Sequence, residues 1–186
     1  MSLVIPDTYA YYWSTTPARI LQKLQQQHQK FWTAERKNKA AALGLTPEQV
    51  YTLASIVEEE TLRNDEKPLI SSVYLNRLRK NMYLGADPTV KFAVGDFTLK
   101  RIYFGHINST ASNPYNTYKN KGLPPGPICT PQAVTIDAVL NTKPSNYLFF
   151  CAKPNGNGYH AFAENETEHF KNAKAYQDWL NANKIQ

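Results

Sequence analysis

The chain has little cysteine, and it lacks any apolar run long enough to cross a membrane. Its 186 residues include only two cysteines, Cys129 and Cys151, at no spacing typical of metal ligands. Two cysteines in a chain of this size do not make a disulfide framework, so we expect both to be reduced and buried in the core. No stretch approaches the roughly 20 apolar residues of a transmembrane helix, and the first residues lack the pattern of a signal peptide. The sequence therefore predicts a globular domain without a metal site.

The composition predicts one domain over residues 1–186. With 42% hydrophobic residues, the chain can bury one core, or one core with a small lobe. Met1, Ser2 and Leu3 precede a segment that is typical of the middle of a domain, so we interpret them as a leader scar on a truncated chain. A membrane anchor or targeting segment would then lie outside this sequence.

Basic residues exceed acidic ones, but they are not clustered. The 21 Lys and Arg residues against 15 Asp and Glu give a net charge of +6, which favours anionic partners such as nucleic acid, a membrane surface or a carboxylated glycan. No basic cluster of five or six residues occurs, and the short groups at 77–80 and 119–121 do not make a nucleic-acid stripe. We therefore expect no nucleic-acid binding.

Three consecutive carboxylates, at residues 58–60, end an otherwise apolar helical stretch. The start of this helix is predicted by Thr46 as N-cap, Pro47 at the first helical position and Gln49 as the partner that closes a capping box. The helix therefore runs from there through the three acids.

The acids point in different directions around this helix. At about 100° per residue, Glu59 points away from the apolar stripe, whereas Glu60 falls between Leu53 and Ile56. Apolar neighbours disfavour a charged carboxyl, so Glu60 can hold a proton to donate near neutral pH, as the acid of a glycosidase must. Glu58 lies about 160° from Glu60 and suits a structural hydrogen bond. The alternative is a solvated helix face, because runs of Glu usually point to water.

The remaining pattern predicts an α+β fold in which helices pack with a small antiparallel hairpin. Apolar positions at helical spacing predict one long amphipathic helix over residues 17–42, ended by Gly44, and a helix that begins near Asp65 or Asn64. Thr130 with Pro131 predicts the start of another helix. Strand-like runs at 147–152 and 159–163 flank the turn residues 155–158, which predicts a hairpin, and a closing helix contains His169 and Trp179.

Polar and aromatic residues that could line a groove occur in two places. Asn76 and Arg77 continue the inward row of the helix that begins near Asp65. Each is either a stem packed on the core with its head in water or a hydrogen-bond donor on a cleft wall. The loop region 84–131 is rich in Gly, Pro, Asn and Tyr, and ordered loops of this kind commonly carry sites. Tyr115 and Tyr118 there could stack on sugar faces, or could simply pack in turns.

Several motifs, in order along the chain, resemble the YceG-like family of endolytic murein transglycosylases, the MltG enzymes. They are residues 54–61, 76–78, 87–90, 115–118, 122–126 and 160–162. The resemblance covers nearly the whole chain and corresponds to the catalytic domain of the family. Family members usually also carry an N-terminal membrane helix and a LysM-like subdomain, which this sequence lacks.

The resemblance implies cleavage of peptidoglycan between N-acetylmuramic acid and N-acetylglucosamine, with formation of a 1,6-anhydro ring. The catalytic glutamate of the family is the second acid of its Glu-x-Glu-Thr motif, which is Glu60 here. The implied location is the outer face of the cytoplasmic membrane, with contact to the membrane only through the missing anchor. Peptidoglycan strands are the expected partner, with the cell-wall synthesis machinery as a further candidate, and no cofactor or metal is required.

The remaining site residues are expected to bind glycan. An ordinary muramidase would need a second carboxylate about 5 to 9.5 Å from the first, for which Asp87 and Glu58 are the candidates. Asp87 equally suits a helix cap, so we assign it a shaping or substrate role, and Glu58 structural support. A glycan-binding scaffold without catalysis is a second alternative. The expected substrate-binding residues are Asn76, Arg77, Asp87, Thr89, Tyr115, Asn116, Thr117, Tyr118, Pro125, Gly126, His160 and Phe162.

Overall fold

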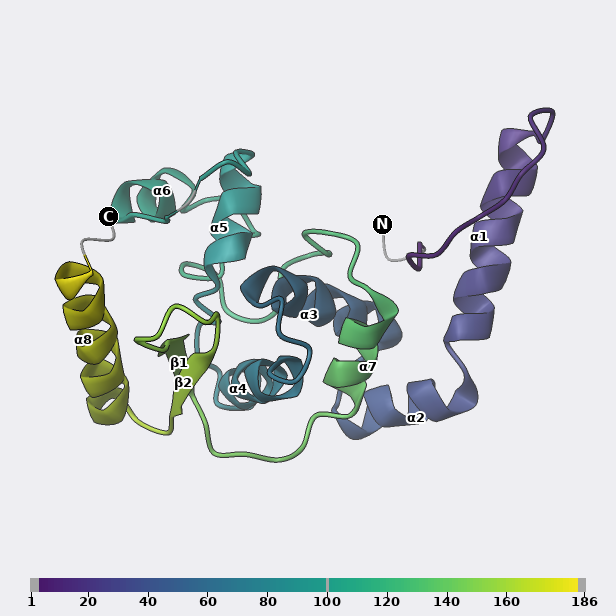
Figure 1. Ribbon diagram of the computed structural model, residues 1–186. Coiled ribbons are helices and arrows are strands. Elements are labelled where there is room, and N and C mark those ends of the chain that lie inside the picture. The colour runs from purple at the N-terminus through teal and green to yellow at the C-terminus, as the bar shows by residue number, and fades with distance from the viewer. Residues whose placement is uncertain (1–3, 100, 184–186) are drawn as a thin grey trace.

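The computed structural model describes residues 4–99 and 101–183, which form helices and one small antiparallel sheet (Figure 1). The α+β class predicted from the sequence is confirmed. No helix among these residues is both long and apolar enough to cross a bilayer. In chain order the elements are α1 (Pro17–Phe31), α2 (Ala34–Ala42), α3 (Pro47–Glu60), α4 (Lys67–Arg79), α5 (Asp87–Val94), α6 (Phe104–Ser109), α7 (Ala133–Leu140), β1 (Phe149–Ala152), β2 (His160–Ala163) and α8 (Glu166–Ala182).

The core is built around α3, which packs against α4 and α7 and is buried on all sides from Val50 to Val57. Its start is as predicted, because Thr46 caps the helix, Pro47 opens it, and the capping box with Gln49 is present. Large apolar side chains of this helix, each worth roughly 1.5–3 kcal/mol when fully buried, hold it rigidly in place. A rigid α3 fixes the position of its last residue, Glu60.

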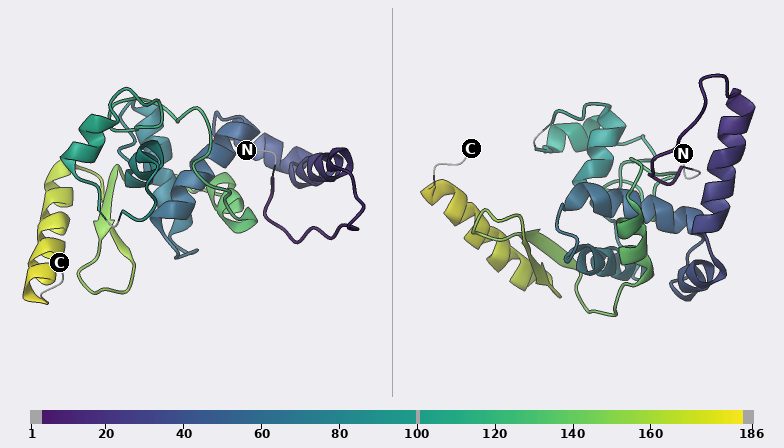
Figure 2. Two further views of the ribbon diagram at one scale, coloured as in Figure 1. Left: turned by 90° about the horizontal axis from the view of Figure 1, so that it is seen from above. Right: turned by 45° about the vertical axis from the view of Figure 1, so that its right-hand side comes forward.

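The single long helix predicted over residues 17–42 is wrong. The structure has two helices, α1 and α2, because Thr33 adopts an extended backbone and its side chain accepts a hydrogen bond from the backbone N–H of Arg36, which starts a new helix. Trp32, beside this break, is buried in the core. The chain therefore turns at this point, and α1 stands away from the helical core (Figures 1 and 2).

Two helix starts also differ from the prediction. α4 begins at Lys67 after Glu66, and neither Asp65 nor Asn64 caps it. α7 begins at Ala133, later than Thr130 and Pro131 suggest. In that segment the backbone N–H of Gln132 donates to Glu58, so residues 130–132 are held against α3 before the helix starts.

The predicted hairpin and closing helix are confirmed. β1 pairs with β2 in antiparallel register, with Phe149 opposite Ala163 and Ala152 opposite His160. α8 starts at its N-cap Asn165 and packs along the outer side of this hairpin (Figure 1). The hairpin thus lies between α8 and the helical core.

The cysteines are free thiols, but they are only half-buried, so the prediction of two core residues is wrong in that respect. Cys129 lies in the loop segment that runs along α3, where its Sγ donates to the carbonyl oxygen of Ser55 at 3.3 Å. Cys151 is in the two-stranded sheet, whose members all keep some exposure except Ala163. A sheet of two short strands cannot bury both of its faces.

Candidate active site

A cleft of about 500 Å³ opens beside the C-terminal end of α3. Its walls come from α3, α4, the segment that leads into α5, the loop before α7, β1 and α8. The hairpin and α8 close one side, and α5 with its preceding residues closes the other. The lining residues are Glu60, Tyr74, Arg77, Leu84, Gly85, Asp87, Tyr118, Phe149, Phe150, Glu166, His169 and Phe170.

Glu60, the last residue of α3, is partly buried and faces this cleft. Its Oε1 accepts a hydrogen bond of 2.5 Å from the hydroxyl of Tyr74, which is buried on α4. Burial raises the pKa of Glu60 to about 7; the Tyr74 hydrogen bond opposes this rise, and the nearby carboxylate of Asp87 adds to it. Glu60 is therefore a carboxyl group that exchanges its proton near neutral pH.

Tyr74 is fixed on both sides of its ring. It packs perpendicular to the ring of Phe150, with centroids 5.9 Å apart, and its hydroxyl donates to Glu60. Burial raises the pKa of Tyr74 well above its ordinary value, so the hydroxyl stays a donor. The sequence did not single out Tyr74 as a site residue, because no local pattern encodes its contact with Glu60.

Arg77 lines the cleft and braces two of its walls. Its Nε donates to the carbonyl oxygen of Leu148 at 2.7 Å and its Nη1 to that of Leu84 at 2.6 Å. The guanidinium carbon also lies 5.2 Å from the ring centre of Phe149. Arg77 is therefore on the cleft wall, as the second of its two alternatives predicted. Its Nε and Nη1 donors, however, already bind backbone carbonyl oxygens.

Asp87 and Tyr118 form a hydrogen-bonded pair that also lines the cleft. The Tyr118 hydroxyl donates to Oδ1 of the exposed Asp87 at 2.6 Å. Asp87 is the first residue of α5 and the N-cap is Ala86, so the alternative role of Asp87 as a helix cap is wrong. Gly85 precedes it with φ +59°, a backbone conformation that favours glycine.

Three predicted substrate-binding residues are buried away from the cleft in a polar network that supports its wall. Thr89 Oγ1 donates to the carbonyl oxygen of Ala86 at 2.6 Å and lies 2.8 Å from Oγ1 of Thr117. Asn116 Nδ2 donates to the carbonyl oxygen of Ile107 at 2.8 Å, and its Oδ1 accepts from the backbone N–H of Tyr118. These residues hold the loop that presents Tyr118.

Four further predicted residues lie elsewhere. Asn76 Nδ2 donates to the carbonyl oxygens of Ser145 and Tyr147, which anchors the segment before β1. Tyr115 packs on Phe92 with ring centroids 4.6 Å apart, and Pro125 lines a separate cavity beside the start of α3. Gly126 lies against the Tyr115 hydroxyl: a Cβ atom built there would be 3.1 Å from that oxygen. None of the four is among the residues that line the cleft.

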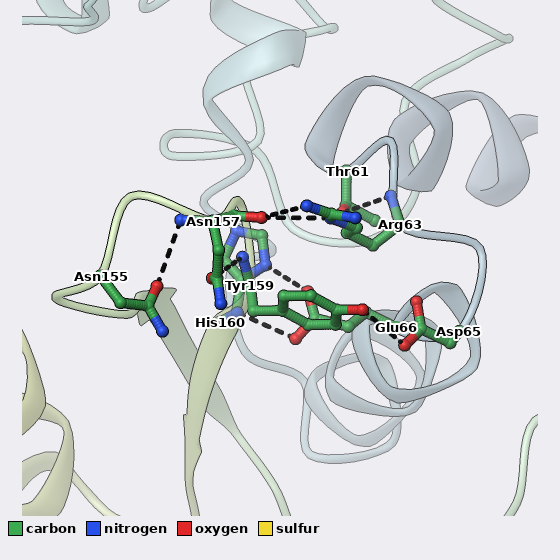
Figure 3. A network of polar contacts seen from close by, with 8 residues as sticks. All are labelled: Thr61, Arg63, Asp65, Glu66, Asn155, Asn157, Tyr159 and His160. Carbon is green, nitrogen blue, oxygen red and sulfur yellow. Dashed lines mark hydrogen bonds and ion pairs between the residues drawn. The ribbon is translucent and has the colours of Figure 1, made fainter.

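His160 and Phe162 were expected to line the groove, but the structure places both behind the cleft wall. Both oxygens of the buried Glu66 carboxylate contact His160. Oε1 accepts a hydrogen bond from the backbone N–H of His160, and Oε2 lies 2.8 Å from Nδ1 of its ring (Figure 3). Phe162 packs on Phe150, with ring centroids 6.2 Å apart. The His160 ring also packs on Phe150, with centroids 5.5 Å apart, so both residues support Phe150, which does line the cleft.

A second contact ties the same two segments together. The Arg63 guanidinium donates to the backbone carbonyl of Asn157 at the hairpin turn and lies 4.7 Å from the ring centre of Tyr159 (Figure 3). Arg63 belongs to the segment that follows Glu60, and Asn157 to the turn between β1 and β2. This network fixes the hairpin wall relative to the end of α3.

Glu58 lies outside the cleft and binds three donors. Its Oε2 accepts from the backbone N–H of Gln132, from the Thr135 hydroxyl, and from Nζ of Lys67 at 3.3 Å. The Lys67 side chain is only 3% exposed, so Glu58 is the counter-charge of a buried ammonium group. Glu59, between the two other acids, is exposed as the helical spacing predicted.

The sequence did not indicate most of the aromatic and α8 residues in the lining. Phe149 and Phe150 were seen only as strand residues, and His169 and Phe170 only as part of the closing helix. No sequence pattern indicated a role for Glu166. Their place in the cleft depends on how α8 packs on the hairpin, which no local pattern encodes.

Comparison with known proteins places the chain in a family. A model of the YceG-like family matches residues 1–175, so the chain belongs to this family. It is 37% identical over 141 residues to an endolytic murein transglycosylase of Bacillus subtilis (strain 168), a match that covers 76% of the chain and 36% of the relative. It is 30% identical over 177 residues to an endolytic murein transglycosylase of Streptococcus pneumoniae, covering 91% of the chain and 31% of the relative.

The fold is also similar to a crystal structure of a YceG-like protein from Listeria monocytogenes. The TM-score is 0.77 at 30% sequence identity, and the match covers 91% of this chain and 53% of that one. The chain spans about a third of the length of the two transglycosylases and about half of the Listeria chain.

Proposed function

We propose that this chain is the catalytic part of an endolytic lytic transglycosylase that cleaves peptidoglycan strands in the bacterial cell envelope, at the outer face of the cytoplasmic membrane. The observation that carries the proposal is the carboxyl group of Glu60, which Tyr74 holds in a cleft and whose pKa is about 7. The names of the relatives support the choice of murein as substrate.

In this reaction one carboxyl group transfers a proton twice. Protonated Glu60 gives its proton to the glycosidic oxygen as the bond from that oxygen to C1 of the muramic acid breaks. The resulting carboxylate then takes the proton from the 6-hydroxyl of the same sugar, whose oxygen attacks C1 and closes the 1,6-anhydro ring. Glu60 ends protonated, as it began, and no water is consumed. A pKa of about 7 suits both steps, because neither protonation state is strongly disfavoured.

A muramidase is the second candidate, because Asp87 places a carboxylate in the same cleft. In a hydrolase that group would activate a water molecule or attack C1 directly. One of its oxygens accepts the Tyr118 hydrogen bond. The other has no hydrogen-bond partner among the described residues and is free to bind a substrate hydroxyl. The two reactions differ in their products, because hydrolysis adds a water that ring closure does not.

The test uses denuded sacculi and mass spectrometry of the released fragments. We expect 1,6-anhydro ends from the parent protein and a loss of roughly 10² to 10⁴-fold in rate for Glu60→Gln, which keeps the shape of the side chain but cannot transfer a proton. Glu59→Gln is the matched control on the same helix turn and should keep the parent rate. Release of hydrolysed ends would favour the muramidase, and a folded parent protein that binds strands without cutting them would favour a scaffold.

A further inference from the structure

The cleft has a second wall, on α8, that the proton transfers of Glu60 do not use. Glu166, His169 and Phe170 project from the first turns of this helix into the cleft, next to Phe149 of β1. Phe170 is 68% exposed although it borders the cleft, and Glu166 is exposed too. A phenylalanine this exposed contributes little to the stability of the fold, so its position at the cleft needs another explanation.

The His169 ring is held in place and offers one nitrogen. It stacks on Phe149 with ring centroids 5.2 Å apart and an interplanar angle of 21°. Among residues 4–99 and 101–183, its Nδ1 is the one buried side-chain nitrogen or oxygen without a hydrogen-bond partner. A buried N–H without an acceptor would cost more than an unprotonated ring nitrogen, so the proton lies on Nε2. Nε2 also has no partner among these residues, and it is therefore an accessible neutral donor.

These side chains match the chemistry of a neutral sugar ring. The apolar face of a hexose packs against an exposed aromatic ring, its hydroxyls donate to carboxylates, and an acetamido carbonyl accepts from a neutral N–H. The carboxylates of Glu166 and Asp87 would repel a sugar that carries its own carboxylate, and the single guanidinium of Arg77 in the lining offsets only one of these two charges.

We propose that the α8 wall is a subsite for an N-acetylglucosamine ring of the strand, which stacks on Phe170 and bonds to Glu166 and to Nε2 of His169. This inference rests on the proposed function and makes it more specific: the uncharged sugar lies on the α8 side of Glu60. The wall would then discriminate against the lactyl-bearing muramic acid at this position.

The first experiment measures binding of tri-N-acetylchitotriose, which contains only the neutral sugar, by isothermal titration calorimetry. We expect Phe170→Ala to weaken binding about tenfold, and Phe170→Tyr to keep it, because the stacking face is retained. Phe104→Ala is the matched control, since Phe104 is 83% exposed on α6 and does not line the cleft. Equal affinities for Phe170→Ala and Phe104→Ala would overturn the subsite.

The second experiment separates the subsite from the proposed reaction. On denuded strands, Phe170→Ala should raise KM with a smaller change in kcat, whereas Glu60→Gln should lower kcat by roughly 10² to 10⁴-fold and still bind the trisaccharide. If the parent protein releases no anhydro ends but Phe170→Ala still loses trisaccharide affinity, the transglycosylase proposal fails and the sugar subsite stands. If the parent is active and Phe170→Ala has an unchanged KM, the subsite fails and the reaction stands.

Discussion

The Tyr74 hydroxyl donates to Oε1 of Glu60 across 2.5 Å, and this contact gives the two oxygens of one carboxyl group different environments. Oε1 is held by Tyr74 of α4. Oε2 has no hydrogen-bond partner among the described residues and is left for the proton that moves to and from the substrate. Tyr74 is thus a positioning residue for the proposed acid.

Tyr74→Phe should lower the rate about tenfold and move the pH profile. The ring keeps its packing on Phe150, while Glu60 loses a hydrogen bond that favours its ionised form. The pKa of Glu60 then rises above about 7, so the alkaline limb of the profile, where the acid form is lost, should shift to higher pH. The measurement is kcat against pH on denuded sacculi. A fall in rate or stability with an unmoved limb would mean that Tyr74 acts only in packing.

The sequence alone predicted the part of the site that local geometry determines. The position of Glu60 follows from the cap at Thr46 and the helical repeat, and both are properties of neighbouring residues. The hairpin and α8 were found for the same reason. The break at Thr33 was missed because a threonine that caps a new helix has the same spacing as one inside a continuous helix.

The sequence could not predict which side chains, distant along the chain, contact one another in the fold. Asn116 and Thr117 have the residue types of sugar-binding groups, yet their polar atoms are consumed by buried hydrogen bonds. His160 is likewise committed to Glu66. Conversely, Phe170 looked like an ordinary helix residue, and only the packing of α8 brings it to the cleft. A polar side chain is available to a ligand only where the fold leaves it without a partner.

Glu58→Gln should lower stability, and Glu59→Gln should not. Glu58 neutralises Lys67, whose side chain is almost fully buried, so the amide would leave that charge uncompensated. Breaking a buried pair in this way costs about 3–5 kcal/mol, which the part-exposed position of Glu58 reduces to roughly 2–3 kcal/mol. Urea denaturation followed by circular dichroism measures both variants. An equal midpoint for the two would contradict the assigned role of Glu58.

Glu60→Gln should raise stability near neutral pH but not in acid. In the folded protein the pKa of Glu60 is about 7, above the 4.5 of an unperturbed glutamic acid. Below about pH 4.5 the group is protonated in both states; as the pH rises to about 7 the unfolded chain loses its proton first, so the folded state becomes less stable. The variant lacks this loss, which is on the order of 3 kcal/mol.

The comparison is the free energy of unfolding of the parent and Glu60→Gln at about pH 4.5, 6 and 7.5. The difference should be small at the first pH and grow in favour of the variant toward the last. A constant difference across this range would show that Glu60 has an ordinary pKa and holds no proton to donate near neutral pH.

Gly85→Ala should reduce both stability and activity. Gly85 has φ +59°, which costs a residue with a Cβ atom about 1–2 kcal/mol, and that atom would lie 3.3 Å from Nη1 of Arg77 and 3.6 Å from the ring of Tyr118. Arg77 cannot move away without weakening its hydrogen bond to Leu84, so both cleft residues should shift.

Gly95→Ala is the control that separates backbone strain from this crowding. Gly95 has φ +79° at the end of α5, and a Cβ atom there would meet no atom within 4 Å. Both variants should therefore lose about 1–2 kcal/mol of stability, but only Gly85→Ala should also lower kcat/KM, by roughly tenfold, because a small displacement of cleft groups has a large effect on rate. Thermal melts and the release of anhydro ends from sacculi measure the two quantities. Equal kcat/KM for the two alanine variants would show that the contact of Gly85 with Arg77 and Tyr118 has no part in shaping the cleft.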